Sequence, residues 1–363
     1  QGLPVRRRRL LRQHPAQRAG NQHQRLRALS MGHLRWRGVR AGRHRAHQIE
    51  ADAFGQRHAV QQVWWRLDVA LDLEMIYWSA KLGAMEALMS GTTGIIDHHE
   101  SPSAIEGSLD VIAQACQEVG VRVICSYGVT DRHGPDGAKR GLQENERFIR
   151  AGGHGMVGVH AAFTCSDELL EQSAGMAHDL GVGVHIHVAE GADDSDAGRR
   201  LEHLAQDDWL LVHCVHLDRQ LKGTIAHNPR SNMNNGVGYA FPARATNKVI
   251  LGTDGIGADM LEEMRLAYVA GRSHDLTITP QTAQDWIENS YHFMPECKND
   301  SVTWNYDSVE SPWHTAFTPG IRALDITSSS GEKLLTNGRP VRVDLDETRA
   351  KAAESAQKLF ALL

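Results

Sequence analysis

Residues 181–190 read GVGVHIHVAE, an apolar, β-branched run that carries two histidines and ends in a glutamate. In a β-strand, residues two apart share one face, so His185 and His187 are predicted to point the same way. Two imidazoles on one buried face cost free energy unless a partner binds them. The run by itself leaves two interpretations open, a metal site and a hydrogen-bonded pair in the core.

Similar apolar runs recur along the chain and alternate with helical segments. The segments at 108–120 and 166–181 each end in a glycine, the residue that commonly stops a helix. Seven strands are predicted, at residues 91–99, 121–128, 155–163, 182–190, 209–216, 223–229 and 248–254. Strands that alternate with helices indicate a parallel sheet covered on both faces, so one strand of a (β/α)₈ barrel is unaccounted for.

Polar residues at the ends of these strands favour a barrel over an open sheet. In a barrel, all carboxyl ends of the strands meet at one mouth, where catalytic groups collect. An open doubly wound sheet usually carries a Gly-rich phosphate loop, which the sequence lacks. The strand-end residues are Asp97, His98, His99, His160, His187, Glu190, His213, His216, His227, Asn228 and Asp254. We predict an α/β protein whose residues 59–320 form a distorted (β/α)₈ TIM barrel.

The two ends of the chain differ from the barrel segment. Residues 321–363 are predicted to supply a hairpin around Asn337-Gly338 and a C-terminal helix over 344–363. Residues 1–58 contain 14 Arg and no Lys and lack strand or helix periodicity. They are interpreted either as a basic arm for nucleic acid or as out-of-frame translation of a GC-rich gene. The second interpretation is favoured, because it also accounts for the missing strand.

The composition excludes several classes of protein. A hydrophobic fraction of 41% and a charged fraction of 23% are ordinary for a soluble enzyme, and a net charge of −5 argues against a nucleic-acid binder. No apolar run reaches the roughly 18 residues of a membrane span, and no signal peptide opens the chain. The five scattered cysteines form no CxxC pair. We therefore predict a cytoplasmic protein without nucleic-acid or membrane partners.

Three of the strand-end side chains could share a metal ion. His187, His213 and Asp254 come from three different predicted strands and offer two imidazoles and a carboxylate. Such a nitrogen and oxygen donor set suits Zn²⁺ or Fe²⁺. The sequence therefore predicts one divalent metal ion, with zinc favoured over iron.

Four motifs, VHIHVAE, VHCVHLD, HNPRSNMNN and LGTDGIGADM, follow one another at predicted strand ends. In this order they resemble the amidohydrolase superfamily, in its branch of chlorohydrolases and cytosine/guanine-type deaminases. The likeness is closest to the SsnA-type aminohydrolases and runs from about Val63 to Arg272. The resemblance implies a barrel with a small β-sandwich built from the chain termini. It also implies metal-dependent deamination of a small purine-, pterin- or pyrimidine-like heterocycle, as in purine catabolism, and we expect a homodimer.

The resemblance assigns roles to the reactive side chains. His187 matches the family's metal ligand on the fifth strand, which leaves His185 as a structural hydrogen-bonding residue. Glu190 matches the glutamate that shuttles a proton. His213 matches the histidine beside the hydrolytic water and is also expected to contact the metal. Asp254 matches the aspartate that touches the metal and accepts the proton of the water.

Three further residues are expected to bind substrate. His160 matches a substrate-contacting histidine of the family, and His99 and Asn232 are assigned to the same role.

The first strand departs from the family pattern. The family carries His-x-His, two further metal ligands, about thirty residues before its paired tryptophans. Here the tryptophans are Trp64 and Trp65, but the stretch near that offset, 31–40, reads MGHLRWRGVR and contains no His-x-His. The alternative to an enzyme is therefore a catalytically impaired barrel that acts as a binding or assembly subunit.

Overall fold

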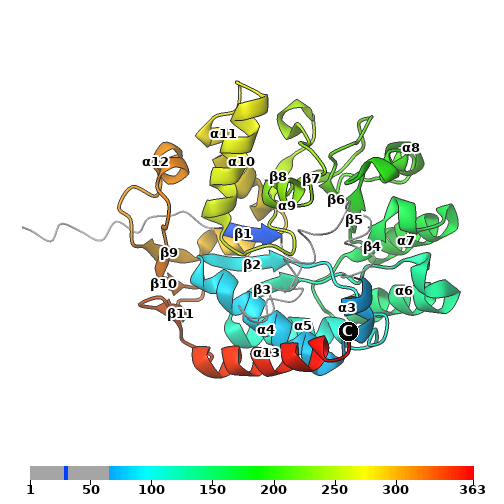
Figure 1. The fold of residues 1–363 in the computed structure, drawn as a ribbon, viewed down its shortest axis with the longest axis horizontal. Coiled ribbons are helices and arrows are strands. Elements are labelled where there is room, and N and C mark those ends of the chain that lie inside the picture. The colour runs from blue at the N-terminus through cyan, green and yellow to red at the C-terminus, as the bar shows by residue number, and fades with distance from the viewer. Residues whose placement is uncertain (1–27, 32–64) are drawn as a thin grey trace, which may run out of the picture.

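The computed structural model describes residues 28–31 and 65–363 (Figure 1). The stretch at 32–40 that departs from the family pattern lies outside these residues. So do Arg6 to Arg9, Arg35 and Arg37, whose guanidinium groups we expect to be buried without partners if the segment is out of frame.

Parallel strands follow one another around the molecule in sequence order. The first sheet contains β1 (Ala28–Met31), β2 (Thr92–Ile96) and β3 (Arg122–Ile124). The second contains β4 (Val157–Ala161), β5 (Val184–Val188), β6 (Leu210–His213), β7 (Thr224–His227) and β8 (Val249–Leu251). Isolated parallel bridges from Cys125 to Gly155 and from Val129 to Val159 connect the two sheets beyond the end of β3. All seven predicted strands are confirmed, although each is shorter than its apolar run.

The strand β1 lies within residues 1–58, the segment in which the first barrel strand was expected although the sequence pattern showed none. Residues 28–31 pair in parallel with β2, at the place of the missing first barrel strand. The strand order is therefore that of a TIM-barrel-like fold. Within the described residues, β8 and β1 are edge strands of separate sheets and do not pair with each other.

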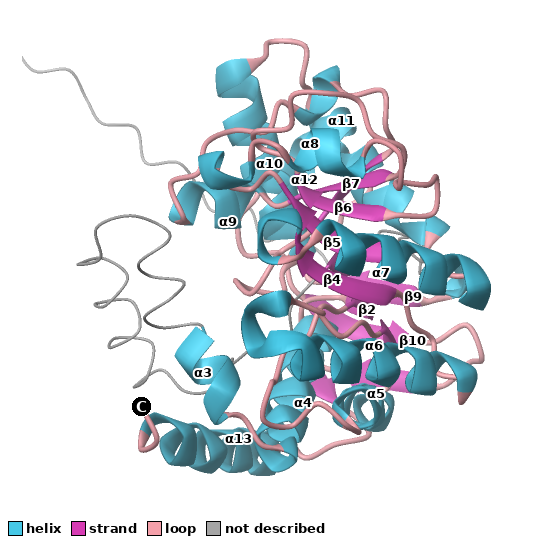
Figure 2. Ribbon diagram, turned by 90° about the vertical axis from the view of Figure 1, so that its right-hand side faces the viewer, coloured by secondary structure: helices cyan, strands magenta, loops and turns pink. Residues whose placement is uncertain are grey.

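Helices cover the outside of the sheets, as Figures 1 and 2 show. In chain order they are α3 (Trp65–Ala70), α4 (Leu73–Met89), α5 (Ser108–Val119), α6 (Gly134–Arg150), α7 (Asp167–Leu180), α8 (Ala197–Leu201), α9 (Pro229–Asn234), α10 (Met260–His274), α11 (Pro280–Glu288), α12 (Pro312–Phe317) and α13 (Leu345–Phe360). The predicted helix stops are confirmed, because Gly120 and Gly181 end α5 and α7 with φ angles of 93° and 67°. In the described part of the chain, no helix has both the length and the apolar character that a membrane crossing requires.

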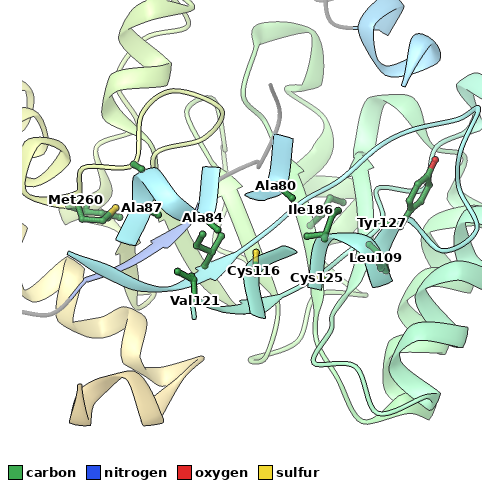
Figure 3. Close-up of a cluster of buried hydrophobic side chains, with 14 of the residues drawn as sticks. Ala80, Ala84, Ala87, Leu109, Cys116, Val121, Cys125, Tyr127, Ile186 and Met260 are labelled. Carbon is green, nitrogen blue, oxygen red and sulfur yellow. The ribbon is translucent and has the colours of Figure 1, made fainter. Parts of the chain in front are cut away.

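The core has two hydrophobic layers. The outer layer lies between the helices and the strands, and the inner layer fills the inner face of the strands. Ile186 of β5 belongs to the larger hydrophobic cluster, which also contains residues of α4 and α5 (Figure 3). The inner layer contains Ile96, Ile124, Met156, Leu210, Val212, Ala226, Ile250, Met294 and Cys297. This apolar filling ends below the carboxyl ends of the strands and leaves that level to the polar side chains.

A small antiparallel sheet follows the barrel segment in the sequence. It has the order β12-β11-β10-β9, with β9 (Ser301–Trp304), β10 (Ala323–Thr327), β11 (Lys333–Thr336) and β12 (Arg339–Pro340). The predicted hairpin is confirmed, since Asn337 and Gly338 turn the chain between β11 and β12 with positive φ angles of 51° and 72°. A second sheet that would complete a sandwich is not seen among the residues described, and α13 packs against α4 instead.

Candidate active site

The two histidines of β5 share one face, as their spacing predicts. The ring centroid of His98 lies 4.7 Å from that of His185 and 4.7 Å from that of His187. His185 is fully buried, and its Nδ1 lies 3.2 Å from the Ser126 hydroxyl, which donates to the Asp97 carbonyl. His185 is thus the structural hydrogen-bonding residue that was expected, one pleat below His187.

The hydrogen bonds of His187 and His213 determine which ring nitrogen carries the proton. His187 Nδ1 lies 2.5 Å from the His160 carbonyl, and His213 Nδ1 lies 2.8 Å from Asn232 Oδ1. The nearer partner of each Nδ1 is an acceptor, so each Nδ1 is assigned as the donor; Asn228 Nδ2 lies further from His213 Nδ1, at 3.4 Å. In the neutral rings the lone pair is then on Nε2, the arrangement of a metal-binding imidazole held by an outer partner. The two rings stack, with centroids 5.5 Å apart.

Two carboxylates converge on the buried imidazole of His213. Glu190 Oε2 lies 3.7 Å from His213 Nε2, and Asp254 Oδ2 lies 3.8 Å from the same atom. The His213 side chain is 1% exposed, whereas those of Glu190 and Asp254 are 24% and 17% exposed. The predicted catalytic side chains are therefore together, with the two carboxylates on the accessible side.

The backbone at these strand ends adopts conformations that are costly for residues with a side chain. The φ angles are 47° at Ala189, 71° at His213, 54° at Cys214 and 51° at Asp254. Each such residue costs on the order of 1–3 kcal/mol and persists only where the surroundings enforce it. The strain is therefore concentrated where β5, β6 and β8 deliver the reactive side chains.

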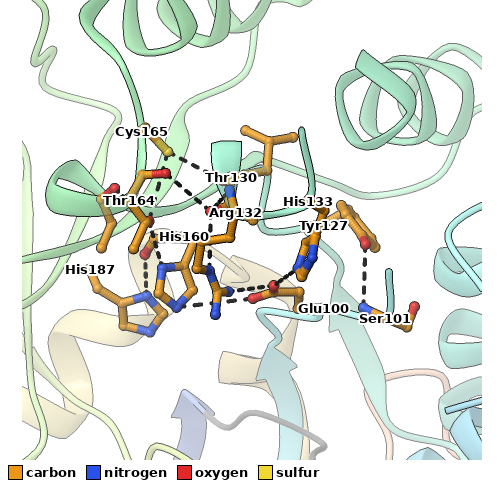
Figure 4. Close-up of polar contacts among 12 residues, drawn as sticks. Glu100, Ser101, Tyr127, Thr130, Arg132, His133, His160, Thr164, Cys165 and His187 are labelled. Atoms are coloured by element: carbon orange, nitrogen blue, oxygen red, sulfur yellow. Dashed lines mark hydrogen bonds and ion pairs between the residues drawn. The ribbon is translucent and has the colours of Figure 1, made fainter. Parts of the chain in front are cut away.

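A buried polar cluster adjoins His187 (Figure 4). His160 lies beside it, with ring centroids 5.6 Å apart, and its Nδ1 pairs with Thr164 Oγ1 at 2.8 Å. Glu100 is fully buried, accepts from His133 Nε2 at 2.8 Å and pairs with Arg132. Its other oxygen lies 4.0 Å from His160 Nε2.

Sequence reasoning missed Glu100, Arg132 and His133. The signal was present in DHHESP and TDRHG, which continue the polar strand ends after β2 and β3. The Arg132 guanidinium also stacks on Trp65, 4.2 Å from the ring centroid.

Three of the residues singled out from the sequence contact other side chains of the protein. His99 pairs with Ser101 Oγ at 2.8 Å, and it is the neighbouring His98 that contacts His187. Asn232 is 1% exposed and is the partner of His213 Nδ1. His227 packs between Tyr239 and Trp286, and burial lowers its pKa to about 3. The expectation that all strand-end polar residues meet at one mouth therefore fails for His227.

The chemistry of the donors fits a divalent metal, but the described residues supply an incomplete set. Burial, followed by the neighbouring His213, lowers the pKa of His187, which favours the neutral ring that binds metals. Within residues 28–31 and 65–363, no three His, Cys, Asp or Glu side chains form a group that could hold a metal ion. The strand β1 reads Ala-Leu-Ser-Met and contributes no histidine.

The sequence profile of the amidohydrolase family matches residues 47–282. This chain belongs to the amidohydrolase family. The family predicted from the four strand-end motifs is therefore confirmed.

Curated relatives of the chain are deaminases. It is 29% identical to a 5'-deoxyadenosine deaminase of Methanopyrus kandleri, over 81% of this chain and 78% of the relative. It is 34% identical to a 5-methylthioadenosine/S-adenosylhomocysteine deaminase of Desulfitobacterium hafniense, over 56% of this chain and 52% of the relative. In the second comparison the chain spans about half the length of the relative.

Solved structures share the fold of the chain. An adenosine deaminase from Xanthomonas campestris with bound zinc superposes with a TM-score of 0.76 at 18% identity, over 92% of this chain and 85% of that chain. An atrazine chlorohydrolase from Arthrobacter aurescens TC1, complexed with zinc, superposes with a TM-score of 0.67 at 20% identity, over 92% and 87%. These likenesses establish a TIM-barrel-like α/β fold.

Asp194, in the loop that carries Glu190, is expected to make the stability of the protein depend on pH. Its Oδ2 accepts from the Ala189 N–H at 2.7 Å, and burial raises its pKa from the usual 3.8 to about 7. Folded Asp194 holds its proton more tightly than unfolded Asp194, so the unfolded state ionises first as the pH rises. The free energy of unfolding therefore falls between about pH 4 and 7. Asp194→Asn keeps the acceptor without the charge, so it is expected to stabilise the protein at pH 8 by on the order of 1–3 kcal/mol.

Urea unfolding at pH 5 and pH 8 checks this prediction. The exposed Asp207→Asn is the matched control and should shift neither curve. A gain for Asp194→Asn that is equal at the two pH values would assign it to packing rather than to ionisation.

Proposed function

We propose that the protein is a metal-dependent hydrolase that deaminates a purine-like heterocycle, with adenosine derivatives as the favoured substrates. The observation that carries the proposal is the pair of carboxylates, Glu190 and Asp254, that face His213 Nε2 at 3.7 and 3.8 Å. Membership in the amidohydrolase family supports the reaction type, and the deaminase names of the relatives support the substrate class.

His187, His213 and Asp254 are the donors that we propose for the metal ion, with zinc favoured over iron, although within the described residues they do not form a complete metal-binding group. When bound, the metal lowers the pKa of a water molecule toward neutrality, so that a nucleophile is present at physiological pH. The reaction consumes this water, forms a ring C=O bond, breaks the exocyclic C–N bond and releases ammonia.

The chain's own residues move the protons and orient the ring. Asp254 accepts a proton from the attacking water. Glu190 carries a proton to the ring nitrogen and then to the leaving amine. His213 would either bind the metal through Nε2 or, with Nε2 protonated, stabilise the charge that develops on the oxygen at the reacting carbon. His160, half-buried beside His187, is placed to contact the ring, and His99 stays a predicted substrate residue.

Ammonia release from a panel of compounds tests the proposal. We expect turnover of 5'-deoxyadenosine, 5'-methylthioadenosine, S-adenosylhomocysteine or adenosine, with kcat/KM at least about 10⁴ M⁻¹s⁻¹ for the best of them. Cytosine, a pterin and an aminotriazine serve as comparison substrates. Turnover of one of these but of no purine would retain the chemistry and reject the purine class.

The second candidate is a catalytically impaired member of the family that acts as a binding or assembly protein. Its support is the incomplete donor set among the described residues, together with a β1 strand that contains no histidine. A homodimer, a cytoplasmic location and a role in purine catabolism stay predictions. Light scattering on the purified protein tests the first of them.

A further inference from the structure

One short helix contacts the reactive side chains of three different strand ends. Asn232, on α9, binds His213. Ser231, on the same helix, donates from Oγ to Asp254 Oδ2 at 2.5 Å. Asn235, the residue after the helix, donates from Nδ2 to Glu190 Oε1 at 3.2 Å. Sequence reasoning used only Asn232 of these three and assigned it to substrate.

The contacts of Ser231 and Asn235 form one continuous bridge between the two carboxylates. Asn235 Nδ2 has two hydrogens, and it lies within hydrogen-bonding distance of both Glu190 Oε1 and Ser231 Oγ, at 3.2 and 3.4 Å. The Ser231 hydroxyl accepts from Asn235 and donates to Asp254. Both hydrogen bonds by which this bridge reaches a carboxylate are therefore donations to it.

The bridge leaves one oxygen of Glu190 available to the reaction. Asn235 binds Oε1, whereas Oε2 is the atom that faces His213 Nε2 at 3.7 Å. On Asp254, Oδ1 accepts from the Gly255 N–H at 2.6 Å and Oδ2 accepts from Ser231. The side chain of Asp254 is thus held at both oxygens, and that of Glu190 at the oxygen away from His213.

The helix that carries the bridge is itself anchored in the protein. The Arg230 N–H donates to Glu263 Oε1 at 3.0 Å, and Arg230 Nε lies 3.1 Å from Glu263 Oε2. Glu263 is fully buried on α10. This double contact connects α9 to the outer helical layer, so that Ser231 and Asn235 have a fixed base.

We propose that Ser231 and Asn235 are positioning residues that hold Glu190 and Asp254 at a set separation around His213 Nε2. Two carboxylates that lie this close to one imidazole repel each other, and a bridge of donors between them offsets this repulsion. The proposal rests on the deaminase function for its kinetic consequence but not for its geometry.

Steady-state kinetics on four test variants and one control variant test the kinetic consequence. Ser231→Ala and Asn235→Ala should each lower kcat about 10- to 100-fold, with KM within about threefold of the parent. The double variant should lose little more than the worse single variant, because both changes break one bridge. Asn235→Asp has the same shape but places a carboxylate against Glu190, so it should be slower than Asn235→Ala. Met233→Ala, an exposed position on the same helix, is the matched control and should keep the parent kcat.

Crystal structures of the parent, of Ser231→Ala and of Asn235→Ala give a readout that does not depend on turnover. In the Ser231→Ala variant, Asp254 Oδ2 should move by more than about 1 Å from its position at 3.8 Å from His213 Nε2. Unmoved carboxylates in both Ala variants, or an Asn235→Asp enzyme as fast as the parent, would overturn the proposal. If the carboxylates move while the parent deaminates none of the compounds in the panel, the positioning role stands and the proposed function fails.

Discussion

Glu190→Gln is expected to abolish ammonia release while the protein still folds and still binds metal. Gln has the same shape as Glu, and its amide oxygen can still accept from Asn235 Nδ2, which lies 3.2 Å from Oε1 in the parent. The amide cannot accept and return a proton, and the proposed reaction uses this group twice in each cycle. We expect kcat to fall by a factor of ~10³ or more, measured as ammonia released from the best substrate of the panel.

The control for this variant is a carboxylate of the same kind outside the site. Glu202, 61% exposed, forms a surface ion pair with Arg219 at 3.0 Å, and such pairs contribute little to stability. Glu202→Gln should therefore keep the parent kcat and melting temperature. If Glu190→Gln retained activity within about tenfold of the parent, the proton shuttle would have to be another residue.

The strand pattern made the site predictable up to the last residue of each strand. The period of two placed His185 and His187 on one face. His185 is buried and His187 half-buried because His187 lies nearer the carboxyl end of the strand. The motifs at the strand ends were enough to predict that Glu190, His213 and Asp254 lie together. Parallel strands deliver their carboxyl ends to one edge, so this inference needs only strand order and direction.

The predicted strand 209–216 shows where the same reasoning stops. In the structure β6 ends at His213, because His213 and Cys214 adopt positive φ angles of 71° and 54°. Neither residue is a glycine, so the local sequence did not predict the turn. The surrounding protein enforces this conformation, and a single-sequence pattern contains no information about those surroundings.

The direction in which the side chain of His227 points could not be predicted from the sequence either. On β7, Ala226 lies in the inner apolar layer, and His227, one residue further, contacts Tyr239 and Trp286. A shift of one residue exchanges the two faces of a strand, and the run GTIAHNP does not determine which face is inside. The contacts of Glu100 and Asn235 depend on pairs of residues 33 and 45 positions apart, which periodicity cannot reveal.

The strand β1 could not be predicted from the composition of its segment. Ala28–Met31 is only four residues long and lies within an Arg-rich segment, so its pattern offered no period to count. Its partner β2 decides its place, through parallel pairing from Ala28 with Thr92 to Met31 with Ile96. Such pairing is a tertiary property and overrides local preference.

Metal removal is the second change for which we expect a very large effect. Dialysis against a strong chelator should reduce ammonia release by a factor of ~10³ or more, because without the metal the attacking water has a pKa near 15.7. Zinc at one equivalent should restore the activity. His187→Ala and Asp254→Asn should each prevent the restoration, since each removes one of the donors proposed to hold the metal.

Metal analysis of the same preparation separates the two candidate functions. Two imidazoles and one carboxylate are the minimum set for a catalytic zinc, and the family adds two imidazoles from its first strand, which are absent from Ala28–Met31. If the protein made from this sequence contains stoichiometric metal and is active, His187, His213 and Asp254 suffice, and our interpretation of residues 1–58 as out of frame is wrong. If it contains little metal and releases no ammonia, a chain with an in-frame first strand that carries His-x-His should gain both. If that chain gained neither metal nor activity, the binding or assembly protein would be favoured, because the donors at β5, β6 and β8 would then bind no metal even beside the first-strand histidines.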